Sequence, residues 1–214
     1  YKEILPTRLV SKSKQPYPLT YNLVDLSNLT YTFKGKKFSI EDFIETFKVA
    51  GLIVVRDGVI LFEDYNFGNS ESTQWVSFSV TKSVTSMLLG AAIQDGFIMS
   101  VEDKVTTYLP QLINSKYKNV SIKEVLHMSS GIDWNEDYTD PSSDVNIAGA
   151  MNSLTLYRYL NTLDTAASPG TKFNYNTGET NLLGGIVRSA IGNSLSSYLE
   201  QKIWKSFGME FDAY

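Results

Sequence analysis

One segment, Val80 to Ile93, limits the possible folds of this chain more than any other. Its apolar residues at positions 80, 84, 87, 88 and 91 fall on one face of a helix. Leu89, Ala92 and Ile93 extend that face until the helix is apolar nearly all round. A helix of this kind is buried by its neighbours, so we expect it in the middle of the protein. Gly96, just past its end, is typical of a helix C-terminus.

A β-hairpin is predicted before this helix. Leu52–Arg56 and Val59–Tyr65 are both rich in β-branched and aromatic residues, and only Asp57 and Gly58 separate them. This pair tolerates the positive φ angles of a tight turn. Residues 1–30 are polar and weakly patterned, so we expect an arm with little regular structure that lies over the surface.

The chain after the apolar helix is predicted to be mostly helical. Helix starts are indicated at Ser121, with Glu124 three residues later, at Ser153 and at Ser194. Together these patterns predict an α+β fold with an antiparallel sheet packed by helices. We expect four parts: an arm at 1–30, part of a sheet subdomain at 31–96, a helical subdomain at 97–205, and the start of a return to the sheet at 206–214.

Composition excludes several classes of function. The 214 residues are 43% hydrophobic, which is typical of a globular chain. The net charge of −4 disfavours nucleic acid as a partner. The chain has no cysteine and one histidine, His127, so we expect no metal site and no cofactor.

The sequence leaves the cellular location open. The longest apolar run, Met87 to Ile93, is far below the roughly 20 residues that cross a bilayer, so no membrane span is expected. The first residue is Tyr1 rather than Met, and a signal peptide is compatible with that start. A cytoplasmic and an extracytoplasmic location, periplasmic or secreted, both remain open.

Ser79 and Lys82 form the main candidate catalytic pair. Residues three apart at a helix start face the same side, so the lysine can contact the serine hydroxyl. A serine becomes a nucleophile when a base takes its proton, and a neutral lysine can be that base. Burial in an apolar helix and the helix N-terminus both favour the neutral amine. The alternative is that Ser79 only caps the helix.

The Ser-x-x-Lys spacing alone is weak, because it occurs three times. The other two pairs lie in polar, lysine-rich segments that offer no burial for a base. They are Ser11 with Lys14 and Ser115 with Lys118.

Two tyrosines are further candidates. Tyr175 precedes a predicted helix and can relay a proton to a leaving group, although it can also be a packed aromatic residue. Tyr138 lies in an acidic loop and either lines a substrate pocket or is exposed.

His127 can serve a serine in principle, but the chain has no Gly-x-Ser-x-Gly motif. Glu136 and Asp144 are assigned no role.

Taken together, these segments resemble a known family. The run SFSVTKSVTSMLLGAAIQDGFI, from 77, resembles the Ser-x-x-Lys helix of β-lactamases and penicillin-binding proteins, and the segment around Tyr175 looks like their tyrosine motif. EDKVTTYLPQL, IKEVLHMSSGIDWNEDY and SPGTKFNYNTGETNLLGGIV follow the class C-like order. The resemblance runs from about Leu29 to Tyr214 and is closest to 6-aminohexanoate-dimer hydrolases and related esterases.

The resemblance implies a role for each matched residue. Ser79 would be the nucleophile, Lys82 the general base and Tyr175 the proton shuttle, with the Ser79 backbone N–H as one oxyanion donor. Tyr138 and Thr177 would contact substrate. Position 177 is threonine, as in the amide hydrolase and esterase branch, where the β-lactamase motif has asparagine.

The resemblance also implies that this chain is an N-terminal portion. Family members continue past the position of Tyr214 with further sheet strands and a Lys-Thr-Gly-like element. A two-stranded hairpin alone is marginal in water. We therefore expect the missing C-terminal segment to be a partner of this chain, and expect the chain alone to be inactive.

The resulting hypothesis is a serine hydrolase that cleaves a small amide or ester through an acyl-serine. One alternative is a β-lactamase or D-amino-acid peptidase, which the same three residues would serve. An alternative of another class is a noncatalytic ligand-binding or sensor module of the penicillin-binding type.

Overall fold

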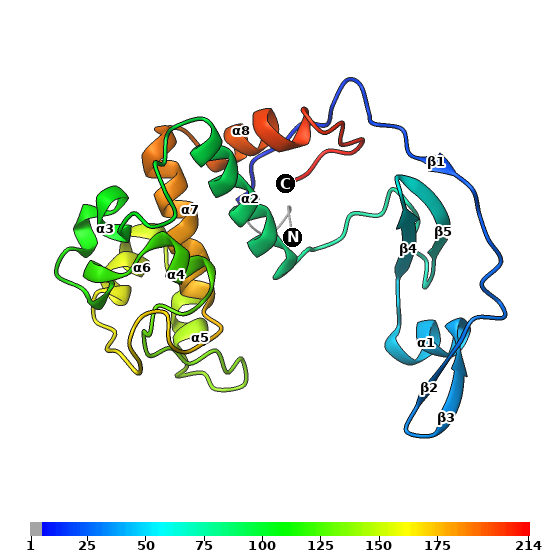
Figure 1. Cartoon of the computed structure of the whole chain (residues 1–214), viewed down its shortest axis with the longest axis horizontal. Helices are drawn as coiled ribbons and strands as arrows, with labels where there is room; N and C mark the ends of the chain where they lie inside the picture. Colours follow the sequence, from blue (N-terminus) through cyan, green and yellow to red (C-terminus); the bar gives the residue numbers. More distant parts are fainter. Residues whose placement is uncertain (1–5) are drawn as a thin grey trace.

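The computed structural model of the chain describes residues 6–214, and Figure 1 shows two groups of elements. Strands and one helix form the first group: β1 (Thr20–Tyr21), β2 (Thr30–Phe33), β3 (Lys36–Ser39), α1 (Ile40–Phe47), β4 (Gly51–Arg56) and β5 (Val59–Tyr65). The second group is helical: α2 (Val80–Gln94), α3 (Val105–Tyr108), η1 (Pro110–Leu112), η2 (Lys116–Asn119), α4 (Ile122–Leu126), α5 (Asp144–Gly149), α6 (Ser153–Leu160), α7 (Thr177–Ile191), α8 (Leu195–Leu199) and the π-helical turn η3 (Glu200–Trp204).

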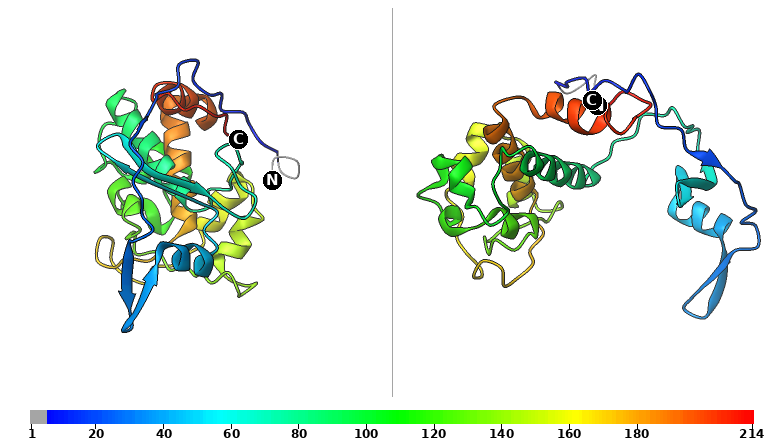
Figure 2. Two further views of the ribbon diagram at one scale, coloured as in Figure 1. Left: turned by 90° about the vertical axis from the view of Figure 1, so that its right-hand side faces the viewer. Right: turned by 45° about the horizontal axis from the view of Figure 1, so that its top comes forward.

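We call residues 20–65 the strand region and residues 80–204 the helical body. In Figure 1 and in the right-hand view of Figure 2 they lie apart, joined by the segment 66–79 and by the N-terminal arm. The structure combines small sheets with several helices, in agreement with the predicted α+β class.

The strand region holds two sheets. β4 and β5 form the predicted antiparallel hairpin, with Asp57 at φ 52° and Gly58 at φ 77° in the turn. β1 adds to β5 in parallel, and β2 and β3 make a separate antiparallel pair beside α1. As predicted, residues 6–30 contain little regular structure: β1, a bridge from Val10 to Ala213 and the first residue of β2. Residues 1–5 of the predicted arm lie outside the described part.

The core belongs to the helical body. α7 packs against α2, α3, α4 and α6, and its buried residues include Leu182, Ile186 and Val187. Apolar residues from α2, α3, α4 and α6 surround them to make one cluster. The helix at the centre of the protein is thus α7.

The expectation that α2 is buried all round is wrong for its first turns. Leu88, Leu89 and Ala92 in its second half are buried against the cluster, and Gly96 follows the helix end at φ 79° as predicted. Val80, however, is 66% exposed and Met87 is 50% exposed. Apolar composition identified the helix, but which faces are covered depends on the elements that pack on it.

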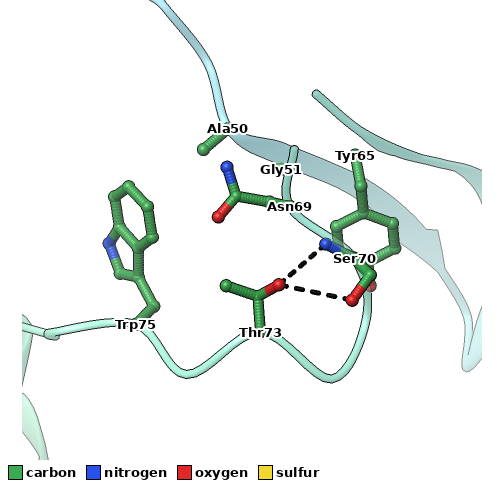
Figure 3. Close-up of a pocket in the computed structure, with 7 residues that line it drawn as sticks. All are labelled: Ala50, Gly51, Tyr65, Asn69, Ser70, Thr73 and Trp75. Carbon is green, nitrogen blue, oxygen red and sulfur yellow. Dashed lines mark hydrogen bonds between the residues drawn. The ribbon is translucent and has the colours of Figure 1, made fainter. Parts of the chain in front are cut away.

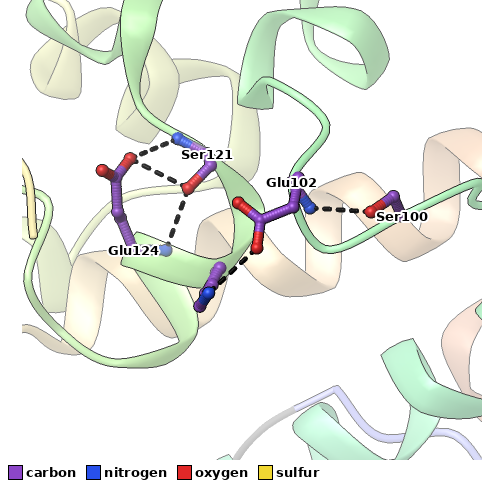
Figure 4. A network of polar contacts seen from close by, with 5 residues as sticks. Ser100, Glu102, Ser121 and Glu124 are labelled. Atoms are coloured by element: carbon purple, nitrogen blue, oxygen red, sulfur yellow. Dashed lines mark hydrogen bonds and ion pairs between the residues drawn. The ribbon is translucent and has the colours of Figure 1, made fainter.

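Local capping explains where the short helices begin. Ser121 and Glu124 form a reciprocal capping box on α4, in which each backbone N–H donates to the other residue's side chain (Figure 4). Ser194 caps α8 as predicted. For α6, Ser153 was predicted as the capping residue, which is one residue late. The cap is Asn152, whose side chain accepts the N–H groups of Leu154 and Thr155.

Candidate active site

The site is centred on the first turn of α2. Lys82 Nζ donates to Ser79 Oγ at 3.1 Å, so the pair that the spacing predicted is formed. Ser79 has helical backbone angles and its side chain makes no capping bond, so the alternative interpretation as a helix cap is wrong. Phe78, just before it, has φ 42°, a left-handed conformation that an L-residue adopts only at a cost.

The other two Ser-x-x-Lys pairs are arranged differently. Ser115 is buried and caps η2, where its hydroxyl donates to the Leu112 carbonyl and accepts the Tyr117 N–H. Ser11 donates its backbone N–H to Glu200. Of the three Ser-x-x-Lys pairs, all within residues 6–214, only Ser79 and Lys82 have the lysine Nζ within hydrogen-bond distance of the serine hydroxyl.

Tyr175 completes a three-residue cluster with this pair. It directly precedes the N-cap of α7, and Lys82 Nζ lies 4.9 Å from the centre of its ring. Burial raises the pKa of the Tyr175 phenol, but hydrogen bonds with Lys82 and Ser79 and the lysine charge outweigh burial and leave the pKa below its ordinary value. Three residues at the starts of two helices distant in sequence therefore lie close together.

The loop 133–143 forms a wall beside Tyr175. Tyr138 is 63% exposed, and its hydroxyl donates to Glu136 at 2.9 Å. A hydrogen bond with Thr177 lowers the pKa of Tyr138, whereas burial and Glu136 raise it, and the net direction is upward. Thr177 opens α7 and donates both its backbone N–H and its hydroxyl to Glu136. Both candidate substrate residues thus meet at Glu136.

Glu136 is the residue of this cluster that sequence analysis missed. Its carboxylate accepts from Trp134, Tyr138 and Thr177, and the last is 41 positions away. No local pattern signals such a long-range role. The nearest available signal is the concentration of acidic side chains in the segment NEDYTD.

The Trp134 ring lies close against Gly178 in the first turn of α7. A Cβ atom on Gly178 would lie 2.9 Å from the Trp134 ring and 3.0 Å from Asn176 Oδ1. Any larger residue at 178 would therefore collide with the indole. The same indole N–H donates to Glu136.

Two other sequence candidates lie outside the cluster. His127 is exposed at the C-terminal cap of α4. Asp144 accepts the Asn135 N–H at 2.6 Å and the Tyr159 hydroxyl, which fixes the base of the loop. Among residues 6–214 no group of three or more His, Cys, Asp or Glu side chains is placed to hold a metal ion, and no helix there is long and apolar enough to cross a membrane.

A separate pocket of about 250 Å³ lies where the strand region meets the connecting segment. Figure 3 shows Trp75 and Tyr65 on its two sides and Asn69 between them, with Thr73 bonded to Ser70. Its lining contains neither the Ser79 pair nor Tyr175. The pocket is therefore distinct from the cluster of Ser79, Lys82 and Tyr175.

The chain is similar in sequence and in structure to known proteins. The curated 6-aminohexanoate-dimer hydrolase of Paenarthrobacter ureafaciens is 30% identical over 220 residues, which cover 99% of this chain and 54% of that protein. A solved structure of a candidate 6-aminohexanoate-dimer hydrolase from Bacillus anthracis superposes with a TM-score of 0.84 at 22% identity, over 99% of this chain and 58% of that one.

A class C beta-lactamase solved with cefoxitin superposes with a TM-score of 0.60 at 23% identity, over 77% of this chain and 46% of that one. This chain thus spans about half the length of these proteins. The model of the Beta-lactamase family matches residues 40–211, and the chain belongs to that family.

Proposed function

We propose that this chain carries the acylation site of a serine hydrolase for small amides or esters. The observation that carries the proposal is the position of Lys82 Nζ, 3.1 Å from Ser79 Oγ and 4.9 Å from the Tyr175 ring centre. Family membership and the similarity to a 6-aminohexanoate-dimer hydrolase support it. No step needs a metal or an organic cofactor.

The chemistry assigns one task to each residue. Lys82 in its neutral form takes the Ser79 proton as Oγ attacks the carbonyl carbon, which makes Lys82 the cation beside Tyr175, and the Ser79 N–H stabilises the oxyanion. Tyr175 passes a proton to the leaving amine or alcohol, which leaves an acyl-serine. Water then attacks the ester, and the same groups return the proton to Ser79. The lowered pKa of Tyr175 makes its phenol a better proton donor than an unperturbed tyrosine.

Turnover is proposed to need a further segment of the same protein. Three consecutive residues of β4, Ile53, Val54 and Val55, are exposed, so neither face of that strand is covered. The relatives are nearly twice as long as this chain. Additional strands paired with the free edge of β4 would extend this sheet into a surface on which helices can pack, and would supply the second oxyanion donor.

Labelling at Ser79 tests the proposal. The longest form of the protein that its gene encodes, and this 214-residue chain, are incubated with a fluorophosphonate probe and with p-nitrophenyl esters. In the longest form we expect an adduct on Ser79 by peptide mass spectrometry, with ester turnover that Ser79→Ala lowers by about 10³-fold or more. The 214-residue chain alone should show no turnover. Ser83→Ala, an exposed serine one turn further along α2, is the matched control and keeps full turnover.

The outcomes separate the alternatives. Labelling without turnover in the longest form would favour the noncatalytic sensor module. Turnover of a chromogenic cephalosporin faster than of any ester would favour the β-lactamase alternative. Labelling that persists in Ser79→Ala would refute the assignment of the nucleophile.

A further inference from the structure

Glu136 carries an unusually complete set of hydrogen bonds for a partly buried carboxylate. Oε2 accepts the Trp134 indole N–H and the Thr177 backbone N–H, the latter at 3.0 Å. Oε1 accepts the Thr177 hydroxyl and the Tyr138 hydroxyl. Burial raises the pKa of Glu136, but these four bonds together hold the pKa below its ordinary value, so the group is an anion.

These bonds fix one side of Tyr175. Thr177 lies two residues after Tyr175, and its N–H and hydroxyl are both held by Glu136. On the other side, Asn174 donates its side-chain amide to the Trp134 carbonyl at 3.1 Å and its backbone N–H to the Met128 carbonyl at 2.8 Å. The phenol is therefore carried by a short span with an anchor at each end.

The charge of Glu136 also acts on the phenol. Among the described residues, the charged groups that act on Tyr175 are Lys82 on α2 and Glu136 on the facing loop. The lysine favours the phenolate, whereas the glutamate favours the phenol. Tyr138, the other titratable group in contact with Glu136, is neutral in the same range because its pKa is raised.

We propose that Glu136 is a positioning residue for Tyr175: it clamps the start of α7 to the loop 133–143, and its negative charge opposes that of Lys82 across the phenol. The inference rests on the proposed function of Tyr175 as proton shuttle. It assigns Glu136 two separable effects, one of geometry and one of charge.

Glutamine can separate the two effects. In Glu136→Gln the amide oxygen can take the place of Oε2 and accept both N–H groups, while the amide nitrogen can donate to the Thr177 and Tyr138 hydroxyls, which accept as readily as they donate. All four contacts are kept and only the charge is lost. Glu136→Ala loses both the contacts and the charge.

The first measurement is the titration of Tyr175. The protein is labelled with ¹³Cζ-tyrosine, and the Tyr175 signal is assigned from its loss in Tyr175→Phe. We expect the midpoint in Glu136→Gln to fall by about 0.5 to 1 pH unit, the size that removing a nearby charge gives at intermediate dielectric constant. Asp137→Asn, which removes an exposed neighbouring carboxylate, is the matched control and leaves the midpoint unchanged. An unchanged midpoint in Glu136→Gln would overturn the effect of charge.

The second measurement is ester turnover in the longest encoded form. At its own optimum Glu136→Gln should retain kcat within about threefold, with the basic limb of the profile moved to lower pH. In Glu136→Ala, kcat should be at least tenfold lower than in Glu136→Gln. The Thr177 amide should also lose its protection from hydrogen exchange. Equal kcat in the two variants would overturn the positioning effect. If Glu136→Ala does not fold, Thr177→Val removes the hydroxyl contact alone and should lower kcat without moving the midpoint.

The titration does not depend on turnover. If wild-type protein is inactive but the Tyr175 midpoint moves in Glu136→Gln, the proposed function fails and the effect of charge stands. If wild type turns over ester and the midpoint does not move, the effect of charge fails and the proposed function stands.

Discussion

The helical body buries far more of its apolar side chains than the strand region does. α7 and its neighbours enclose one apolar cluster in which Ile186 and Leu182 are fully buried. In the strand region, Ile44 and Ile60 are the only buried hydrophobic residues among described residues 20–65. Lys82 and Tyr175 lie in the helical body, and Ser79 directly precedes it. The candidate active site therefore derives its geometry mainly from the better packed of the two regions.

The largest expected difference between the regions is in the cost of truncating a side chain. Ile186→Ala should destabilise the chain by about 2 to 5 kcal/mol, because it opens a cavity at a fully buried position. Ile53→Ala, at a position that is 50% exposed, should cost about 0.5 kcal/mol or less. Urea unfolding followed by circular dichroism measures both. Equal costs would show that the two regions are packed alike.

A smaller effect, counted per pH unit, is expected from a buried acid of the helical body. Glu179 is buried on α7, and burial raises its pKa to about 8, against an ordinary value of 4.5, although a bond with Ser130 lowers it. Between these values the folded state holds a proton that the unfolded state has released. The contribution of Glu179 to stability is therefore largest below about pH 4.5 and falls as pH rises toward 8, by at most about 1.4 kcal/mol per pH unit.

Glu179→Gln removes this dependence. The variant and wild type should be close in stability at pH 5, and the variant should be the more stable at pH 8. Urea unfolding at intervals of one pH unit gives the difference, and Asp137→Asn serves as the exposed control. A difference that is the same at every pH would show that Glu179 does not bind a proton in the folded state.

The smallest expected effect is in the strand region. Val55→Thr, at a position that is 45% exposed, should change the stability of this chain by less than about 0.5 kcal/mol. In the longest encoded form the same substitution should lower the stability by more if the further segment covers the faces of β4. Comparing the two forms by urea unfolding therefore sharpens the contrast, and identical small effects in both would argue against such a cover.

Sequence reasoning succeeded where a structure depends on neighbouring residues. The Asp57 and Gly58 turn, the end of α2 before Gly96 and the contact of Ser79 with Lys82 are all local, and each is present. The start of α6 was misplaced because Asn152 and Ser153 are both good capping residues and only one can take the position.

Long-range features were out of reach of the same reasoning. Glu136 acquires its role from Thr177, 41 residues away, and the exposure of Val80 depends on which elements pack against α2. Periodicity reports that a face is apolar, but it does not report what covers that face. The predicted subdomain boundaries and the roles of Tyr138 and Thr177 stay predictions.

The close approach of Gly178 to Trp134 has a consequence for how this family can vary. A methyl group at 178 would push the indole away, and the indole carries an N–H that Glu136 accepts. Positions 134, 136 and 178 should therefore covary among homologous sequences, with a side chain at 178 appearing where the indole is replaced by a smaller group. A change at a glycine that touches no catalytic atom would then reach the phenol of Tyr175 through two intermediates.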